Sequence, residues 1–151
     1  MLVRCVRQKP TDSQVEDLGE YYKKYSLKND SHLTVDKTYL VLGLVMNTCY
    51  PRMGKGAWVT LQCDYGHITS YPFALFEVID GTVDPEWTVR SRPDGIVDAQ
   101  PELLHEERFA ENYLDGIPEA VKAFRELLKR MEQRKGKRGQ PESLSEIDCQ
   151  T

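Results

Sequence analysis

The stretch TYLVLGLVMN, residues 38–47, decides the fold. Its apolar residues follow one another instead of alternating with polar ones, so we expect other parts of the protein to cover both faces of this strand. Gly43 stands in the middle of the run, where a glycine indicates a bulge or a sharp bend. The stretch therefore predicts a bent central strand, or one wrapped into a small barrel.

Shorter strand patterns lie on both sides of this segment. They cover residues 2–7, 57–64, 67–71, 74–80 and 86–90. Short consecutive strands with turns between them are typical of a small antiparallel sheet that is strongly bent or closed into a barrel.

Helical patterns lie before and after these strands. Ser13 and Glu16 have the spacing of a capping box, which predicts a helix from about residue 12 to 26. Apolar spacing predicts a second helix over 101–114 and a third that begins near Pro118. The fold class is therefore α+β, a strongly bent antiparallel sheet or SH3-like β-barrel with one N-terminal and two C-terminal helices. Residues 1–132 are predicted to form one domain and residues 133–151 a flexible polar tail.

The composition limits the class of protein. The chain has 151 residues, 40% hydrophobic and 29% charged, which suits one soluble domain. No apolar run approaches the ~20 residues of a membrane span, and the N-terminus lacks the apolar region of a secretory signal. We expect a cytoplasmic protein without membrane contact, with its four cysteines as free thiols.

Negative charge is concentrated between Glu77 and Glu119. This window holds twelve carboxylates and three arginines, while the whole chain has a net charge of −4. Two interpretations stay open, a solvated face and a surface that attracts a basic protein. Under the second, the partner-binding residues include Asp84, Glu86, Asp94, Asp98, Glu102 and Glu106. Trp58 and Tyr65 are the predicted aromatic anchors of the same interface.

The sequence has no motif for catalysis, metal or cofactor binding. Cys63 and His67 have C-x3-H spacing, but the paired short spacings of a zinc site are absent. We therefore predict a protein that is not an enzyme and that needs no cofactor. A small enzyme with a dispersed site of Cys49, Cys63, His67 and His105 remains an alternative.

Basic residues collect later, between Lys129 and Arg138. At the end of a helix they oppose the negative end of the helix dipole. A regulatory SH3-like module that binds nucleic acid or a peptide through them is a further alternative. The cluster lacks interleaved aromatic residues and the net charge is negative, so no nucleic-acid partner is expected.

Glu77 is the one charged residue inside the apolar run 74–79, which Asp80 follows. A buried carboxylate without a partner is very costly, so we expect Glu77 to be paired or exposed at an edge. Alternation predicts that Ala74, Phe76 and Val78 face the core.

Several segments together resemble a known group of proteins. The order LVRCVR, a polar helix, DKTYLVLGL and then YPFALFEVID…PEW is similar to small bacterial SH3-like-barrel proteins related to immunity proteins of polymorphic-toxin and contact-dependent inhibition systems. The resemblance covers roughly residues 1–90. It implies a non-enzymatic inhibitor whose partner is a cognate toxin domain, such as a basic nuclease.

Overall fold

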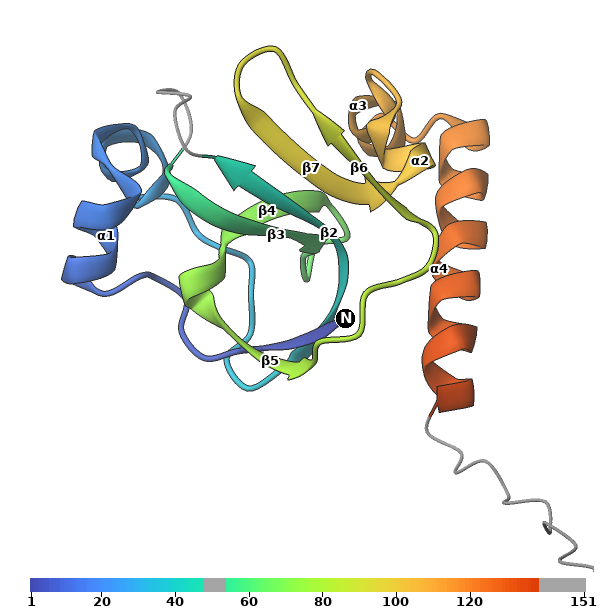
Figure 1. Ribbon diagram of the computed structural model, residues 1–151, viewed down its shortest axis with the longest axis horizontal. Helices are drawn as coiled ribbons and strands as arrows, with labels where there is room; N and C mark the ends of the chain where they lie inside the picture. Colours follow the sequence, from blue (N-terminus) through green and yellow to red (C-terminus); the bar gives the residue numbers. More distant parts are fainter. Residues whose placement is uncertain (48–53, 139–151) are drawn as a thin grey trace, which may run out of the picture.

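The computed structural model describes residues 1–47 and 54–138 (Figure 1). The strands are β1 Leu2–Cys5, β2 Thr38–Asn47, β3 Gly56–Gln62, β4 Ile68–Pro72, β5 Phe76–Asp80, β6 Trp87–Ser91 and β7 Ile96–Pro101. The helices are α1 Asp12–Leu18, α2 Glu102–His105, α3 Phe109–Leu114 and α4 Pro118–Arg138, with a π-helical turn at Tyr22–Ser26 and a 3-10 turn at Phe73–Leu75. No helix within these ranges has the length and apolar character needed to cross a membrane.

Strand β2 is the centre of the sheet and changes partner along its length. One edge pairs first with β1, where Leu40 faces Leu2, and then with β7, where Leu44 faces Ala99. The other edge pairs with β3, and a bulge separates Val41 from Gly43. All described strand pairs are antiparallel, and the described strands do not close into a barrel. The predicted α+β class with an antiparallel sheet is therefore confirmed, whereas the predicted alternative of an SH3-like barrel is not.

The bend requires glycine at position 43. A Cβ atom on Gly43 would lie 2.7 Å from Gln100 Cβ and 3.1 Å from the Ala99 carbonyl oxygen. The end of β7 thus lies close against β2 at the point where β2 has no side chain, which is the close approach that an isolated strand glycine indicates.

Three buried clusters meet at β2. Val41 belongs to the first, inside the curve of β1 to β5. Leu42 points to the second, where Phe124 and Leu127 of α4 pack. Val45 joins the third, with Leu18 and Trp58. This arrangement explains why β2 is apolar on both faces, because buried clusters pack against both of them.

The predicted N-terminal helix is interrupted at Gly19, after which residues 20–21 are helical again and run into the π-helical turn Tyr22–Ser26. Helix α1 ends at Leu18, because Gly19 has a φ of 95° that a right-handed helix does not allow. The capping box is also displaced, since Thr11 is the N-cap and exchanges hydrogen bonds with Gln14 at 3.4 and 2.9 Å. Ser13 and Glu16 do not form the predicted box.

The predicted helix 101–114 is wrong in its continuity. Residues up to Pro101 belong to β7, a strand that the sequence pattern did not predict. Helices α2 and α3 are separate, because Arg108 between them has a left-handed φ of 63°. Helix α4 continues to Arg138, so the predicted tail boundary at 133 falls inside it. Residues 139–151 lie outside the described ranges.

Glu77 is both paired and exposed at the edge of the sheet. Arg4 Nη2 lies 2.5 Å from Glu77 Oε2, and the Glu77 side chain is 53% exposed, so this prediction is confirmed. The predicted core face of β5 is wrong beyond Phe76, because Val78 is 42% exposed. The reason is that β5 is an edge strand, paired only with β1 among the described strands, and no helix covers it (Figure 1).

Substitution of Gly43 by alanine is expected to lower the free energy of unfolding by about 1–3 kcal/mol, because the added methyl group forces β7 away from β2. The measurement is urea denaturation followed by circular dichroism. Gly136→Ala is the matched control, since a Cβ there meets no atom within 4 Å and alanine favours a helix. Equal stability of Gly43→Ala and the wild type would contradict the close approach.

Candidate functional site

Asp84 and Glu86 are used inside the molecule. They lie between β5 and β6, facing the C-terminal half of α4. Arg134 donates to Asp84 at 2.9 and 3.0 Å, and the Asp84 side chain is only 4% exposed. Arg130 donates to both oxygens of Glu86 at 3.1–3.2 Å. These two acids therefore attach α4 to the sheet, which makes them poor candidates for contact with a partner.

The basic cluster near the C-terminus supplies the cations for this attachment. Besides Arg130 and Arg134, Lys135 Nζ lies 2.5 Å from Asp80 Oδ2. We call Asp80, Asp84, Glu86, Arg130, Arg134 and Lys135 the α4 ion-pair cluster. Hydrogen bonds from Arg130 hold the pKa of Glu86 below its usual range, and Lys135 does the same for the pKa of Asp80.

Asp98 and Glu102 hold the β6–β7 hairpin in place. Asp98 is buried on β7, with Oδ2 3.1 Å from Arg92 Nε across the hairpin. Glu102 accepts the Thr88 hydroxyl at 2.7 Å and pairs with Arg90. The Thr88 hydrogen bond lowers the pKa of Glu102. Both predicted site residues thus lie at one end of the molecule but are already paired there.

The other predicted contact residues fall into three environments. Asp94 is exposed in the hairpin turn and accepts the Ile96 N–H at 3.2 Å. Glu106 is exposed between α2 and α3. Tyr65 is 69% exposed and stacks on His32, with 4.2 Å between ring centroids. Trp58 is not an anchor, since it is 6% exposed in a core cluster and its indole N–H donates to the Gly54 carbonyl.

A groove of about 500 Å³ separates the β6–β7 hairpin from α2 and α3. Asp98, Glu106 and Arg92 line it, together with His105 and the apolar ring of Phe109. The groove brings together residues that are far apart in the predicted window, and Figure 1 shows the hairpin standing beside α2 and α3.

His105 is fixed in this groove by two hydrogen bonds. Gln100 Nε2 also donates to the Leu104 carbonyl, so its amide nitrogen faces His105 Nδ1, 3.3 Å away. His105 Nε2 lies 3.1 Å from the Thr88 carbonyl, which can only accept. Both ring nitrogens are therefore occupied by the protein itself.

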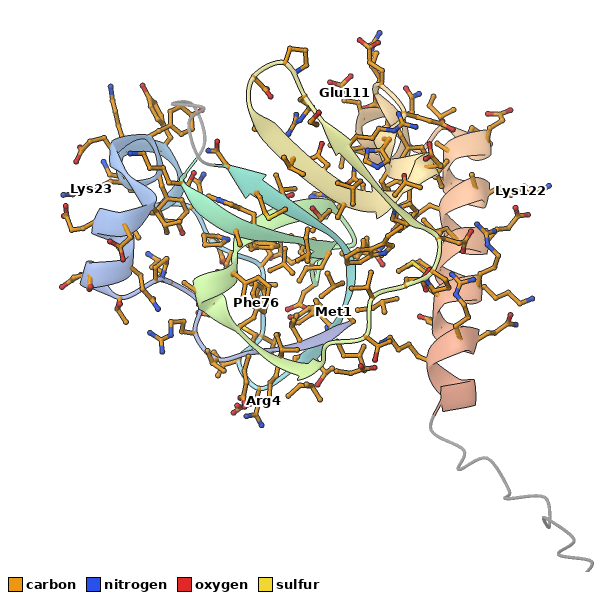
Figure 2. All side chains as sticks on the ribbon, viewed as in Figure 1. Met1, Arg4, Lys23, Phe76, Glu111 and Lys122 are labelled. Carbon is orange, nitrogen blue, oxygen red and sulfur yellow. The ribbon has the colours of Figure 1, made fainter. Side chains whose placement is uncertain are left out.

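Carboxylates without ion pairs remain around α3. Within the described residues, no ion pair is formed by Glu106, Glu107, Asp115 or Glu119. Glu111 pairs only with the exposed Arg108, and Figure 2 shows it pointing away from the body of the molecule. Between these acids Leu114 is 59% and Ile117 43% exposed. We call residues 106–119 the acidic end; its two exposed apolar side chains were not predicted as contacts, although they stand between the acids in the sequence.

The predicted Cys/His set is not assembled in one place. Cys63 and His67 line a second cavity, near the β3–β4 turn, whereas His105 lines the groove. Cys49 lies outside the described residues. Cys5 is buried, its thiol donates to the Arg7 carbonyl, and burial raises its pKa. Among residues 1–47 and 54–138, no group of three or more His, Cys, Asp and Glu side chains could hold a metal ion.

Comparisons with known proteins identified no relative of this chain. No protein-family model matches the chain, and neither a curated protein nor a solved structure matches it at a significant level. The resemblance to bacterial immunity proteins therefore stays a prediction.

Removal of Arg134 tests the α4 ion-pair cluster. Arg134→Ala is expected to lower the free energy of unfolding by about 2 kcal/mol at pH 7, because the buried Asp84 carboxylate loses its partner while the part-exposed arginine limits the loss. Hydrogen bonds from Arg130 and, to a smaller extent, from Arg134 lower the pKa of Glu86 in the folded state, so the stabilising effect of Glu86 is full above the unfolded pKa of about 4.3 and is lost as the pH falls. The cost of Arg134→Ala should therefore shrink towards pH 3.

The matched control is Arg125→Ala. Arg125 is an exposed residue of the same helix without an ion pair among the described residues. Its substitution should change stability by less than about 0.5 kcal/mol at either pH. If both variants unfold at the same urea concentration, the cluster does not hold α4.

Proposed function

We propose that the protein is a non-enzymatic inhibitor that binds and neutralises a toxin domain, as bacterial immunity proteins do, and that the acidic end meets a basic partner. One observation carries the proposal. In the acidic window, the carboxylates of β5 to β7 are largely used in internal ion pairs, whereas those around α3 are not. The unpaired charge is therefore concentrated beside a groove and around exposed apolar residues.

The acidic end combines the two properties that a protein interface needs. Leu114 and Ile117 offer apolar area, which supplies affinity when a partner removes it from water. The surrounding carboxylates supply attraction at a distance, which raises the rate of association by about 10–10³. The helix dipole accounts for only part of this charge, since Glu119 alone lies in the first turn of α4.

The groove gives the interface depth. Its floor carries the buried Asp98 carboxylate, and Glu106 lines it on the α2–α3 side. An arginine or lysine of a partner would find the Glu106 carboxylate there, since Asp98 is already paired with Arg92. Toxin domains that cleave nucleic acids are rich in such side chains because they hold phosphates.

Neither alternative function gains a specific observation. A nucleic-acid or peptide module that uses the basic cluster needs Arg130, Arg134 and Lys135, which are engaged with acids of the β5–β6 segment. The four residues of a dispersed Cys/His enzyme are divided, because Cys63 and His67 line one cavity, His105 lines the groove and Cys49 lies outside the described residues.

Charge reversal at the acidic end tests the proposed interface. The triple variant Glu106→Lys, Glu107→Lys, Asp115→Lys should slow association with the toxin domain by at least about tenfold and reverse the salt dependence of its rate, because the steering field changes sign. The partner is obtained by co-expression with the gene next to this one in its native locus, followed by co-purification and a growth-rescue assay. Association rates are then measured by surface plasmon resonance.

The control reverses as many charges elsewhere. Asp17, Glu126 and Glu132 are exposed and form no ion pair among the described residues. Their replacement by lysine should leave the rate within about threefold, since exposed charges more than a Debye length from the interface are screened. Equal rates for both triple variants would refute the acidic end as the interface, and failure to rescue growth would refute the inhibitor function.

A further inference from the structure

Strand β5 has one free edge. It pairs with β1 along one side, and no other described strand pairs with it. Val78 is 42% exposed and the next residue, Ile79, is 50% exposed. Two consecutive apolar side chains are thus exposed on a strand whose backbone is unpaired along one side. Proteins usually protect such an edge, because it is a ready template for a strand of another chain.

The backbone groups of Val78 point to the free side of β5. The Val6 N–H donates to the Leu75 carbonyl at 2.9 Å, so the backbone groups of Leu75 face the β1 side. In an antiparallel pair this direction alternates from one residue to the next, and the β1–β5 register is regular up to the pair of Val78 with Val3. The N–H and C=O groups of Val78 therefore point away from β1. Among the described residues no other backbone group bonds to them.

The charges beside this edge cancel within one molecule. Glu77 is paired with Arg4, and Asp80 is paired with Lys135. The edge therefore carries no excess charge that would select a basic or an acidic partner, in contrast to the acidic end. Two copies of the chain, each with a net charge of −4, can meet here without bringing unpaired carboxylates together.

The sequence of β5 fits antiparallel pairing with itself about a twofold axis at Val78. Val78 then lies opposite Val78 of the second copy, and the two residues exchange both of their N–H···O hydrogen bonds. In this register Ile79 lies opposite Glu77 of the second copy, so no two carboxylates are directly opposite each other. Registers shifted by one or two residues place Glu77 opposite Asp80 or opposite Glu77 of the second copy, which like charges disfavour.

We infer that the protein forms a homodimer in which the free edges of β5 from two copies pair antiparallel at Val78. The pairing satisfies the outward backbone groups of Val78 and removes the side chains of Val78 and Ile79 from water. Because the strand is short, the contact is small and the dimer is a weak one. Strand β5 and the acidic end around α3 lie far apart in Figure 1, so the inference does not depend on the proposed inhibitor function.

Sedimentation equilibrium of the full chain tests the inference, with a reducing agent present so that no disulfide joins two copies. We expect the wild type to dimerise with a dissociation constant below about 1 mM. Val78→Lys and Val78→Glu each place two like charges opposite one another across the axis, so each should weaken dimerisation at least about tenfold. An equimolar mixture of the two variants places lysine opposite glutamate, and its association should return to within about threefold of the wild type.

Val89→Lys is the matched control. Val89 is a 70% exposed valine of β6, which pairs only with β7 among the described strands, so its replacement should leave dimerisation unchanged. A wild type that stays monomeric at about 1 mM would overturn the inference. Dimerisation that Val78→Lys leaves intact, or that Val89→Lys weakens as much, would overturn it as well, because the contact would lie elsewhere. If the mixture of Val78→Lys and Val78→Glu does not associate, the twofold pairing at Val78 is wrong.

Discussion

The fold depends on the bend of β2 at Gly43. Without a side chain at this position β7 comes close enough to pair with the second half of β2, while β1 pairs with the first half. One strand then serves three cores, through Val41, Leu42 and Val45. The β6–β7 hairpin and the helices after it are placed by this bend, and so is the groove between them.

Internal ion pairs decide which charges are available to other molecules. Twelve of the 24 acids of the chain lie in one window and eight of its 20 bases lie in α4, and folding brings a part of each together. The α4 ion-pair cluster neutralises the β5–β6 segment and attaches the last helix to the sheet. What remains unpaired in the window lies around α3. The unpaired charges of the folded protein are therefore distributed differently from the charged residues along the sequence, although the net charge is the same.

Local patterns predicted the strands well and the contacts poorly. The bend at Gly43 follows from one glycine in an apolar run, and the pairing of Glu77 follows from the cost of burying a lone carboxylate. Strand β7 was not predicted because Asp98 and Pro101 are unusual in strands, and its short sequence alternates weakly. The partners of Asp84 and Glu86 could not be predicted from local patterns. Arg134 and Arg130 follow them in the sequence by 50 and 44 positions, and only the tertiary fold brings them together. The prediction of Trp58 as an interface anchor is wrong, because the sequence alone does not distinguish a buried aromatic side chain from an exposed one.

The acidic end beside the groove is a surface that follows from this arrangement. The claim that the protein meets its partner there is tested most directly by amide hydrogen exchange of the chain alone and in the complex. We expect exchange to slow in the hairpin turn, residues 91–96, and in residues 103–119, and to stay unchanged in residues 12–32. Slowing confined to residues 12–32 or to the β5–β6 segment would contradict it.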